Sequence, residues 1–185
     1  TAIIAGPTAD VSANAGNKPY NIENVSPDAH LAPSVGDSSS KTSSKAWHKI
    51  DGVCYNGSGK KVEGAITRGM DVSEWQGKIN WKEAKKDLDF AFVRISYGTR
   101  HLDDYYDYNM TEAEAADVPV GTYVYSLAKT NKEALAEAQL AIRQMQGHKV
   151  SYPVAFDLED EATLGNLTRK EISQIALTFC DEIRK

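Results

Sequence analysis

Three acidic residues stand where apolar, strand-like runs of the sequence end, and their placement suggests acid–base chemistry. Asp71 lies in RGMDVSEWQG (68–77), and Asp157 and Glu159 lie in YPVAFDLEDE (152–161). The two runs belong to the first and fourth units of an alternating strand–helix pattern. In a βα barrel, residues at the carboxyl ends of distant strands converge on the face that carries the active site. A pair of carboxylates on that face is what cleavage of a glycosidic bond requires.

Asp157 and Glu159 are two residues apart on an expected strand, so their side chains should point to the same face. Their α-carbons would then lie about 6.6 Å apart. Carboxylates this close should have pKa values that split, leaving one protonated as a general acid and the other ionised. Side-chain rotation leaves the carboxyl separation open, so the spacing does not choose between retaining and inverting chemistry. By residue type alone, the same acids also fit an acidic loop before a helix or a divalent-cation site.

Three tyrosines and one arginine are further candidates for the same site. Tyr97, Tyr123 and Tyr125 lie at or near the ends of the second and third strand-like runs. There they could stack on a sugar ring and hydrogen-bond to it, although barrel strands also bury aromatic side chains. Arg94 lies within the second run, where an unpaired charge is costly, so we expect a buried carboxylate partner for it. Asp71, taken alone, also fits a turn or a helix N-cap.

The elements that must position these residues form four successive strand–helix units. The expected strands cover residues 68–72, 90–96, 118–126 and 153–158. The expected helices cover 81–88, 108–117, a segment from the capping box Thr130–Glu133 to Gly147, and a segment that begins at the capping box Thr168–Glu171. Near-continuous apolar strands are typical of a parallel sheet covered on both faces, which predicts an α/β fold of the (β/α) barrel type.

The chain divides into three parts by composition. Residues 1–46 are rich in Ser, Ala and Asn and are predicted to be a flexible, disordered leader. Residues 47–67 predict a small β-hairpin with its turn at NGSG (56–59). Residues 68–185 amount to roughly half of the 200 or more residues of a complete eight-fold barrel. We therefore expect the first half of a barrel, truncated at the C-terminus.

Charge and hydropathy argue against several classes of function. The net charge is −5, and no basic cluster exceeds the pairs Lys60–Lys61 and Lys85–Lys86, so we expect no nucleic-acid partner. No apolar stretch reaches the length of a transmembrane helix, so membrane insertion is not expected. The four histidines share no metal-ligand spacing, and the sequence predicts neither a metal nor a cofactor.

Two cysteines and one acidic segment have weaker interpretations. Cys54 and Cys180 could form a disulfide, but Cys180 also fits a small buried residue on a helix and Cys54 a half-exposed residue of the hairpin. HLDDYYDY (101–108) is acidic and aromatic, and we expect a solvated loop that leads into the second helix.

Five segments together resemble the lysozymes of glycoside hydrolase family 25. They are RGMDVSEWQGKINW, FAFVRISYG, VPVGTYVYS, YPVAFDLEDE and ALTFC, and the resemblance runs through residues 68–185 in order and spacing. It implies a compact βα barrel that cleaves the β-1,4 bond between N-acetylmuramic acid and N-acetylglucosamine in peptidoglycan. The later strands of the family, with their aromatic residues and a further acid, have no counterpart in this sequence.

The resemblance also implies roles for the candidate residues. Glu159 would be the general acid/base, and Asp157 would either attack the anomeric carbon or orient the N-acetyl group of the substrate to do so, with retention of configuration. Asp71 would lie in the same cleft. The tyrosines Tyr97, Tyr123 and Tyr125 would line its floor, and we place Arg94 with these substrate-binding residues.

The same resemblance implies a secreted, bacteriolytic protein that acts on peptidoglycan glycan strands of the cell wall. The hairpin at 47–67 resembles a single cell-wall-binding repeat. A non-catalytic wall-binding protein and an inactive fragment of the hydrolase are the alternatives, but a binding module would not need Asp71, Asp157 and Glu159 together. A chitinase-type barrel is disfavoured because only the last two acids of its DxxDxDxE pattern are present at 152–159.

Overall fold

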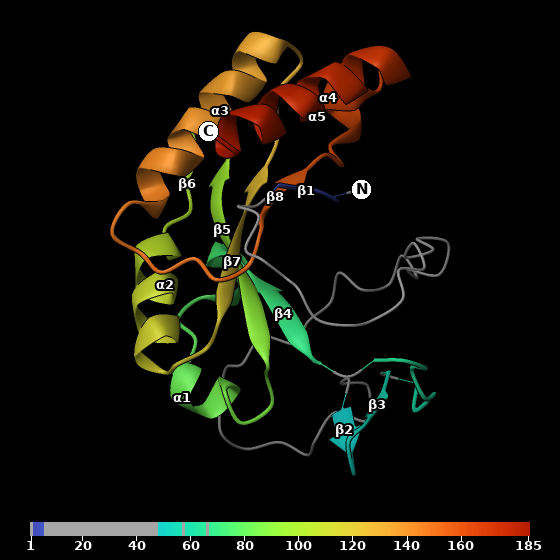
Figure 1. Cartoon of the computed structure of the whole chain (residues 1–185), viewed down its shortest axis with the longest axis vertical. Coiled ribbons are helices and arrows are strands. Elements are labelled where there is room, and N and C mark those ends of the chain that lie inside the picture. The colour runs from blue at the N-terminus through green and yellow to red at the C-terminus, as the bar shows by residue number, and fades with distance from the viewer. Residues whose placement is uncertain (1, 6–47, 57, 66) are drawn as a thin grey trace. The chain divides into compact units, whose positions relative to one another are not determined.

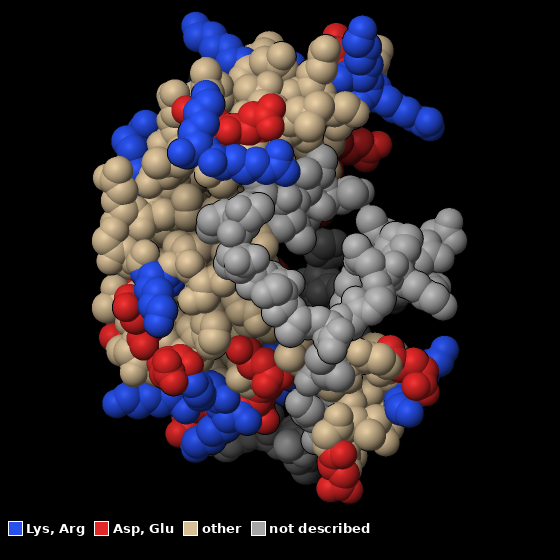
Figure 2. Space-filling view, viewed as in Figure 1, with Lys and Arg blue, Asp and Glu red and all other residues tan. Residues whose placement is uncertain are grey.

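The computed structural model describes residues 2–5, 48–56, 58–65 and 67–185 (Figure 1). The chain forms two compact units, one made of Thr1–Pro7 with Ala65–Lys185 and the other of Thr8–Gly64. No helix in the described ranges is both long and apolar enough to cross a membrane. On the face that Figure 2 shows, Lys and Arg side chains lie in separate groups beside Asp and Glu.

Four parallel strands make the centre of the larger unit. They are β4 (Gly69–Val72), β5 (Phe90–Tyr97), β7 (Val120–Tyr125) and β8 (Val154–Asp157). Each strand pairs in parallel with the one that precedes it in this series, so the order in space is the order in the chain. A βα barrel has this consecutive order, whereas a doubly wound sheet reverses at a switch point. The α/β prediction and its barrel type are confirmed.

Three longer helices cover one side of this sheet (Figure 1). They are α2 (Tyr106–Ala115), α3 (Asn131–Met145) and α5 (Arg169–Ile183). Val93, Val124 and Phe156 are fully buried between sheet and helices, and the ring of Phe156 stacks on Phe179 of α5 at 4.0 Å between centroids. Helices α3 and α5 begin as the sequence predicts, because the hydroxyls of Thr130 and Thr168 cap them, whereas α2 begins two residues before its predicted start.

An additional strand lies at the edge of the sheet. β1 (Ala2–Ala5) pairs antiparallel with β8, with Ala2 opposite Asp157. The expectation of a disordered leader was therefore wrong for these four residues, while residues 6–46 lie outside the described ranges. The physical reason is that the edge of β8 offers unpaired backbone groups, and an apolar segment containing two isoleucines is suited to pair with them.

Several short elements differ from the prediction. Helix α1 (Trp81–Ala84) ends four residues early, because Asp89 bonds through both its backbone and its carboxylate to Arg68 and turns the chain into β5. Besides β1, three elements were not predicted: η3 (Glu74–Gln76), β6 (His101–Leu102) and α4 (Glu161–Leu164). The solvated-loop prediction for 101–108 was wrong, because β6 pairs with β5 and Asp103 and Tyr106 are buried.

The smaller unit contains a two-stranded hairpin of β2 (His48–Ile50) and β3 (Val53–Tyr55). Its turn is Asp51–Gly52, both at positive φ, as a tight two-residue hairpin turn requires. The predicted turn at 56–59 is not the turn between β2 and β3. It lies between Tyr55 and Lys61, which form an isolated antiparallel bridge. Cys54 is buried and not half-exposed, because its side chain faces inwards from β3. Cys180 is buried on α5 as predicted, and both thiols are free.

Candidate active site

The side of the sheet away from the helices carries the predicted site residues. In the strand register Asp71 is opposite Phe92, Arg94 is opposite Tyr123, and Tyr125 is opposite both Tyr97 and Asp157. Residues paired in this way share a face of the sheet, and so do residues two apart on one strand. The fold thus brings predicted site residues from four strands onto one surface, which we call the open face.

An irregularity in β5 makes this arrangement possible. Arg94 and Tyr97 are three residues apart, so a regular strand would point them to opposite faces. Between Arg94 and Ser96 the register slips by one residue, because the successive partners in β7 are Tyr123 and Val124. This β-bulge returns Tyr97 to the face of Arg94. The ring of Tyr97 then stacks on that of Tyr125, with centroids 4.8 Å apart and planes inclined by 19°.

The three candidate acids lie at the carboxyl end of the sheet. Asp71 lies in β4 and is exposed, whereas Asp157 is the last residue of β8 and is half-buried. Glu159 lies two residues beyond the end of β8 and is exposed. The prediction that it stands on the strand beside Asp157 was wrong, because the chain leaves the sheet to start α4 with Asp160 as N-cap. The strand alternation therefore does not set the direction of the Glu159 side chain.

Burial and the negative charges of these acids raise the pKa values of two tyrosine hydroxyls. Burial and then the charge of Glu159 raise the pKa of Tyr125 to about 12, with smaller contributions from Asp160 and Asp157. Burial and then the charge of Asp71 raise the pKa of Tyr123 well above its usual range, and Asp157 adds to the effect. Both hydroxyls remain neutral at physiological pH and can donate hydrogen bonds. The charges of Asp71 and Asp157 thus act on Tyr123, and those of Glu159 and Asp157 on Tyr125.

Arg94 has the buried carboxylate partner that its position predicts. Its Nε donates to Asp103 Oδ2 at 2.9 Å and its Nη2 donates to Glu74 Oε1 at 2.7 Å. The Asp103 carboxylate is wholly buried and also accepts the backbone N–H groups of Glu74 and Tyr105. Asp103 thereby joins the loop after β4, strand β5 and the start of α2. Its charge is compensated by Arg94, which makes its burial tolerable.

Glu74 extends this network to the surface. Its Oε2 lies 2.8 Å from His101 Nε2. The hydrogen bond from His101, together with the charge of Arg94, holds the pKa of Glu74 below its usual range against the opposing effect of burial. A reciprocal capping box between Ser73 and Gln76 shapes the short helix η3 that carries Glu74. Glu74, His101 and Asp103 were not predicted as site residues, although the need of Arg94 for an acidic partner pointed to the nearby acidic segments.

These groups surround a pocket of about 400 Å³. Its lining consists of Glu74, Trp75, Arg94, Tyr97, His101 and Tyr125. Trp75 is 78% exposed, so it is not a core residue and offers an aromatic surface at the rim. One wall of the pocket is aromatic and the other is charged. Such a combination suits a ligand with both apolar ring faces and polar groups, as a carbohydrate has.

Comparison with known proteins places this architecture in a family. The sequence model of glycosyl hydrolases family 25 matches residues 70–185. Lysozyme M1 of Streptomyces globisporus is 38% identical over 60 residues, which cover 32% of this chain and 20% of that protein. The uncharacterized protein YegX of Escherichia coli strain K12 is 27% identical over 113 residues, covering 57% of this chain and 41% of YegX.

Solved structures show the same fold. The modular autolysin LytC of Streptococcus pneumoniae superposes with a TM-score of 0.61 at 24% identity, over 74% of this chain and 35% of that chain. A family 25 glycosyl hydrolase from Bacillus anthracis superposes with a TM-score of 0.57 at 22% identity, over 66% of this chain and 57% of that chain. The chain thus spans less than two thirds of the length of each of these relatives.

Proposed function

This chain belongs to glycosyl hydrolases family 25, and we propose that it supplies the catalytic acids of a peptidoglycan hydrolase. The substrate would be the β-1,4 bond between N-acetylmuramic acid and N-acetylglucosamine. The proposal rests on Asp71 and Asp157, whose strand register puts them on the open face with Tyr123 and Tyr125, and on Glu159, whose charge acts on Tyr125. LytC has also been solved in complex with a synthetic peptidoglycan ligand, which supports this class of substrate.

In the proposed mechanism Glu159 acts as general acid and then as general base. Its proton passes to the glycosidic oxygen as the bond from the anomeric carbon to that oxygen breaks. Asp157 either attacks the anomeric carbon directly or orients the substrate's N-acetyl oxygen to attack it. Glu159 then removes a proton from a water molecule, whose oxygen bonds to the anomeric carbon from the side that the leaving group vacated, as the bond from that carbon to the Asp157 or N-acetyl oxygen breaks. The configuration at the anomeric carbon is retained.

The remaining open-face residues would bind and orient the sugar. The neutral hydroxyls of Tyr123 and Tyr125 can donate hydrogen bonds to sugar oxygens, and the stacked rings of Tyr97 and Tyr125 give an apolar floor. Asp71 lies where it can bond to the sugar or tune Tyr123. We assign Arg94 mainly to holding the pocket wall, because two of its donors are engaged by Asp103 and Glu74.

We also propose where the protein acts and how its other parts contribute. Family 25 chemistry implies a secreted protein that works on the cell wall, with peptidoglycan glycan strands as its partner. The hairpin at 47–67 would add a wall-binding surface. Pelleting of the isolated segments with purified wall tests this assignment, since a hairpin that never co-sediments has no wall-binding role.

The catalytic proposal is tested by the loss of turbidity of purified peptidoglycan. The chain is compared with a version extended to a full family 25 barrel, each with Glu159 intact and as Glu159→Gln. We expect the intact extended version to clear the suspension, and Glu159→Gln to bind the wall but not to lyse it. Lysis by Glu159→Gln would remove Glu159 from the acid role. Binding without lysis by every version would favour a non-catalytic wall-binding protein.

The stereochemical part of the mechanism has its own test. Proton NMR of the first reducing ends released distinguishes the two anomers before they equilibrate. A product of β configuration is expected, because a retaining enzyme preserves the configuration of the β-1,4 bond. An α product would replace the double displacement by a single attack of water.

A further inference from the structure

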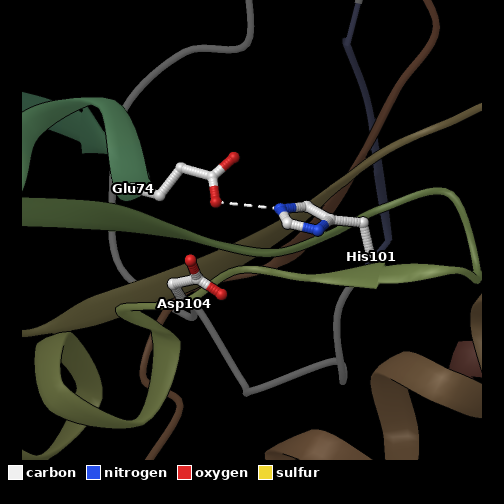
Figure 3. A group of neighbouring side chains, drawn as sticks. All are labelled: Glu74, His101 and Asp104. Atoms are coloured by element: carbon white, nitrogen blue, oxygen red, sulfur yellow. Dashed lines mark hydrogen bonds and ion pairs between the residues drawn. The ribbon is translucent and has the colours of Figure 1, made fainter.

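We propose that Glu74, His101 and Asp104 form a binding site for a divalent metal ion of the zinc class at the rim of the pocket. The three side chains come from η3, from β6 and from the segment before α2, and Figure 3 shows them gathered together. One ligand atom from each lies within 4.8 Å of the others. Ligand spacing along the sequence does not show this group, because Glu74 is far from the other two residues in the chain.

The donor set suits such an ion. One imidazole nitrogen and two carboxylate oxygens are ligands of zinc, with water able to take the fourth position. Tetrahedral bonds of about 2.0–2.2 Å would bring the ligand atoms to about 3.3 Å from one another, which small side-chain movements can reach. A magnesium ion would be a poorer match, since it prefers oxygen ligands and keeps most of its water.

The existing hydrogen bond marks where the metal would enter. Glu74 Oε2 and His101 Nε2 are joined by a hydrogen bond of 2.8 Å. A metal ion would take the place of the proton in this hydrogen bond, and the ring proton of a neutral His101 would then lie on Nδ1. Glu74 Oε1 would keep its hydrogen bond from Arg94 Nη2 at 2.7 Å. The carboxylate would thus link the metal to the arginine, an outer contact that orients a metal ligand.

The backbones that carry the three ligands are held by a common anchor. The buried Asp103 carboxylate accepts the backbone N–H of Glu74 at 2.8 Å and that of Tyr105 at 3.0 Å. Asp103 lies directly before Asp104, and its own N–H donates to Ile95 of β5. His101 of β6 is held by its antiparallel pairing with Tyr97 of β5. The ligands are therefore mounted on a rigid frame, which lowers the cost of gathering them around an ion.

Carboxylates outnumber arginine side chains around this site, which favours the binding of a cation. Glu74 and Asp103 share one guanidinium, that of Arg94. Within the described ranges Asp104 takes part in no ion pair, and it is exposed at the same rim. Arg94 thus pairs with two of the three carboxylates, and a divalent ion would neutralise the excess. The nearby guanidinium weakens the attraction, so we expect selective but moderate affinity.

Calorimetric titration of the full 185-residue chain with Zn²⁺ tests the proposal. We expect one ion per chain at this site, and His101→Ala should weaken that binding by about 100-fold or more, because loss of a ligand exceeds the about 10–100-fold effect of outer-shell changes. Asp104→Asn removes the charge of another ligand and should likewise weaken it by about 100-fold; being an exposed change, it should leave the fold intact. Mg²⁺ should give no comparable heat.

His148→Ala is the matched control. Among the described residues, His148 is paired with the carboxylate of Asp107 alone, at 3.6 Å, so its removal should leave zinc binding unchanged. Equal affinity in wild type, His101→Ala and Asp104→Asn would overturn the proposal, as would the absence of binding to the wild-type chain. Because the readout is binding, it does not depend on whether the protein lyses peptidoglycan.

Discussion

The two faces of the central sheet have opposite chemistry although the same four strands build both. The helix side is mostly apolar, and Val93, Val124 and Phe156 are fully buried there. The open face carries charge at its carboxyl end, where Arg94 is buried among carboxylates. At the amino end of the open face, Phe90 instead stacks on Tyr152 with ring centroids 5.1 Å apart. Polar groups on this face are thus concentrated where the strands end.

This difference teaches that stability and chemistry are largely separated within single strands. Alternate residues of one strand serve the two faces, so a substitution acts mainly on the face to which its side chain points. Asp157 and Phe156 are neighbours in β8 and make the sharpest pair for testing this division. A charged residue that also stabilises the structure of the open face does not follow this division. Its substitution should affect both stability and activity.

The largest effect is expected for Asp157→Asn on the open face. In a version extended to a full barrel, we predict a loss of peptidoglycan lysis of about 10³-fold or more, equivalent to roughly 4 kcal/mol in the activation barrier. The midpoint of urea unfolding should change little, because the side chain is half-buried at the end of the strand. Initial rates of turbidity loss and urea unfolding curves measure the two properties separately. A variant that lyses at the wild-type rate would remove Asp157 from the mechanism.

Phe156→Ala should do the reverse. We expect the free energy of unfolding to fall by about 3–5 kcal/mol, because a fully buried ring that stacks on Phe179 leaves a cavity. Phe156→Leu is the matched control and should cost much less, since it keeps most of the buried volume. Denaturant unfolding gives these values. Zinc and wall binding of the folded fraction should be unchanged, and a large loss of either would show that the faces are coupled.

Arg94→Met tests the boundary between the two faces. Arg94 lies on the open face, yet its removal leaves the wholly buried Asp103 without its charged partner. We predict a loss of about 3–5 kcal/mol in unfolding free energy. Arg100→Met, at an exposed position, is the control and should lie within about 0.5 kcal/mol of wild type. If Arg94→Met proves as stable as the control, the pocket wall does not depend on this ion pair.

The sequence revealed the periodic parts of the fold better than the irregular ones. Apolar runs and helix caps sufficed to predict four strand–helix units, because both signals are local. The bulge after Arg94 lies within the apolar run 90–96 and leaves no signal in residue type. Asp103 looked like a solvated residue, since only its contact with Arg94, formed in three dimensions, makes its burial favourable. The site was thus predictable as acids at strand ends, but not as a charged pocket wall.

The smallest effect concerns a buried carboxylate on the helix side. Glu137 of α3 accepts hydrogen bonds from the Ser126 hydroxyl at 2.7 Å and from the Leu127 backbone N–H at 3.0 Å, at the end of β7. Unlike Glu74, it has neutral donors. Burial raises its pKa above the ordinary value of 4.5, and the two hydrogen bonds only partly oppose this. Its ionised form is therefore less favourable in the folded than in the unfolded chain.

The sign of the resulting pH dependence follows from this raised pKa. The folded state holds the proton of Glu137 more tightly than the unfolded state does. The contribution of Glu137 to the free energy of unfolding is therefore fully present below about pH 4.5 and is lost as pH rises through the higher folded-state pKa. Glu137→Gln should remove that decline in stability. Glu133→Gln is the control on the same helix. The backbone N–H of Lys129 lowers the pKa of Glu133, so its contribution is present above 4.5 and is lost as pH falls through the lower folded-state pKa. Urea unfolding across this pH range gives the difference in unfolding free energy between the wild type and each variant. Plotted against pH, the two differences should have slopes of opposite sign, and equal slopes would show that burial does not govern Glu137.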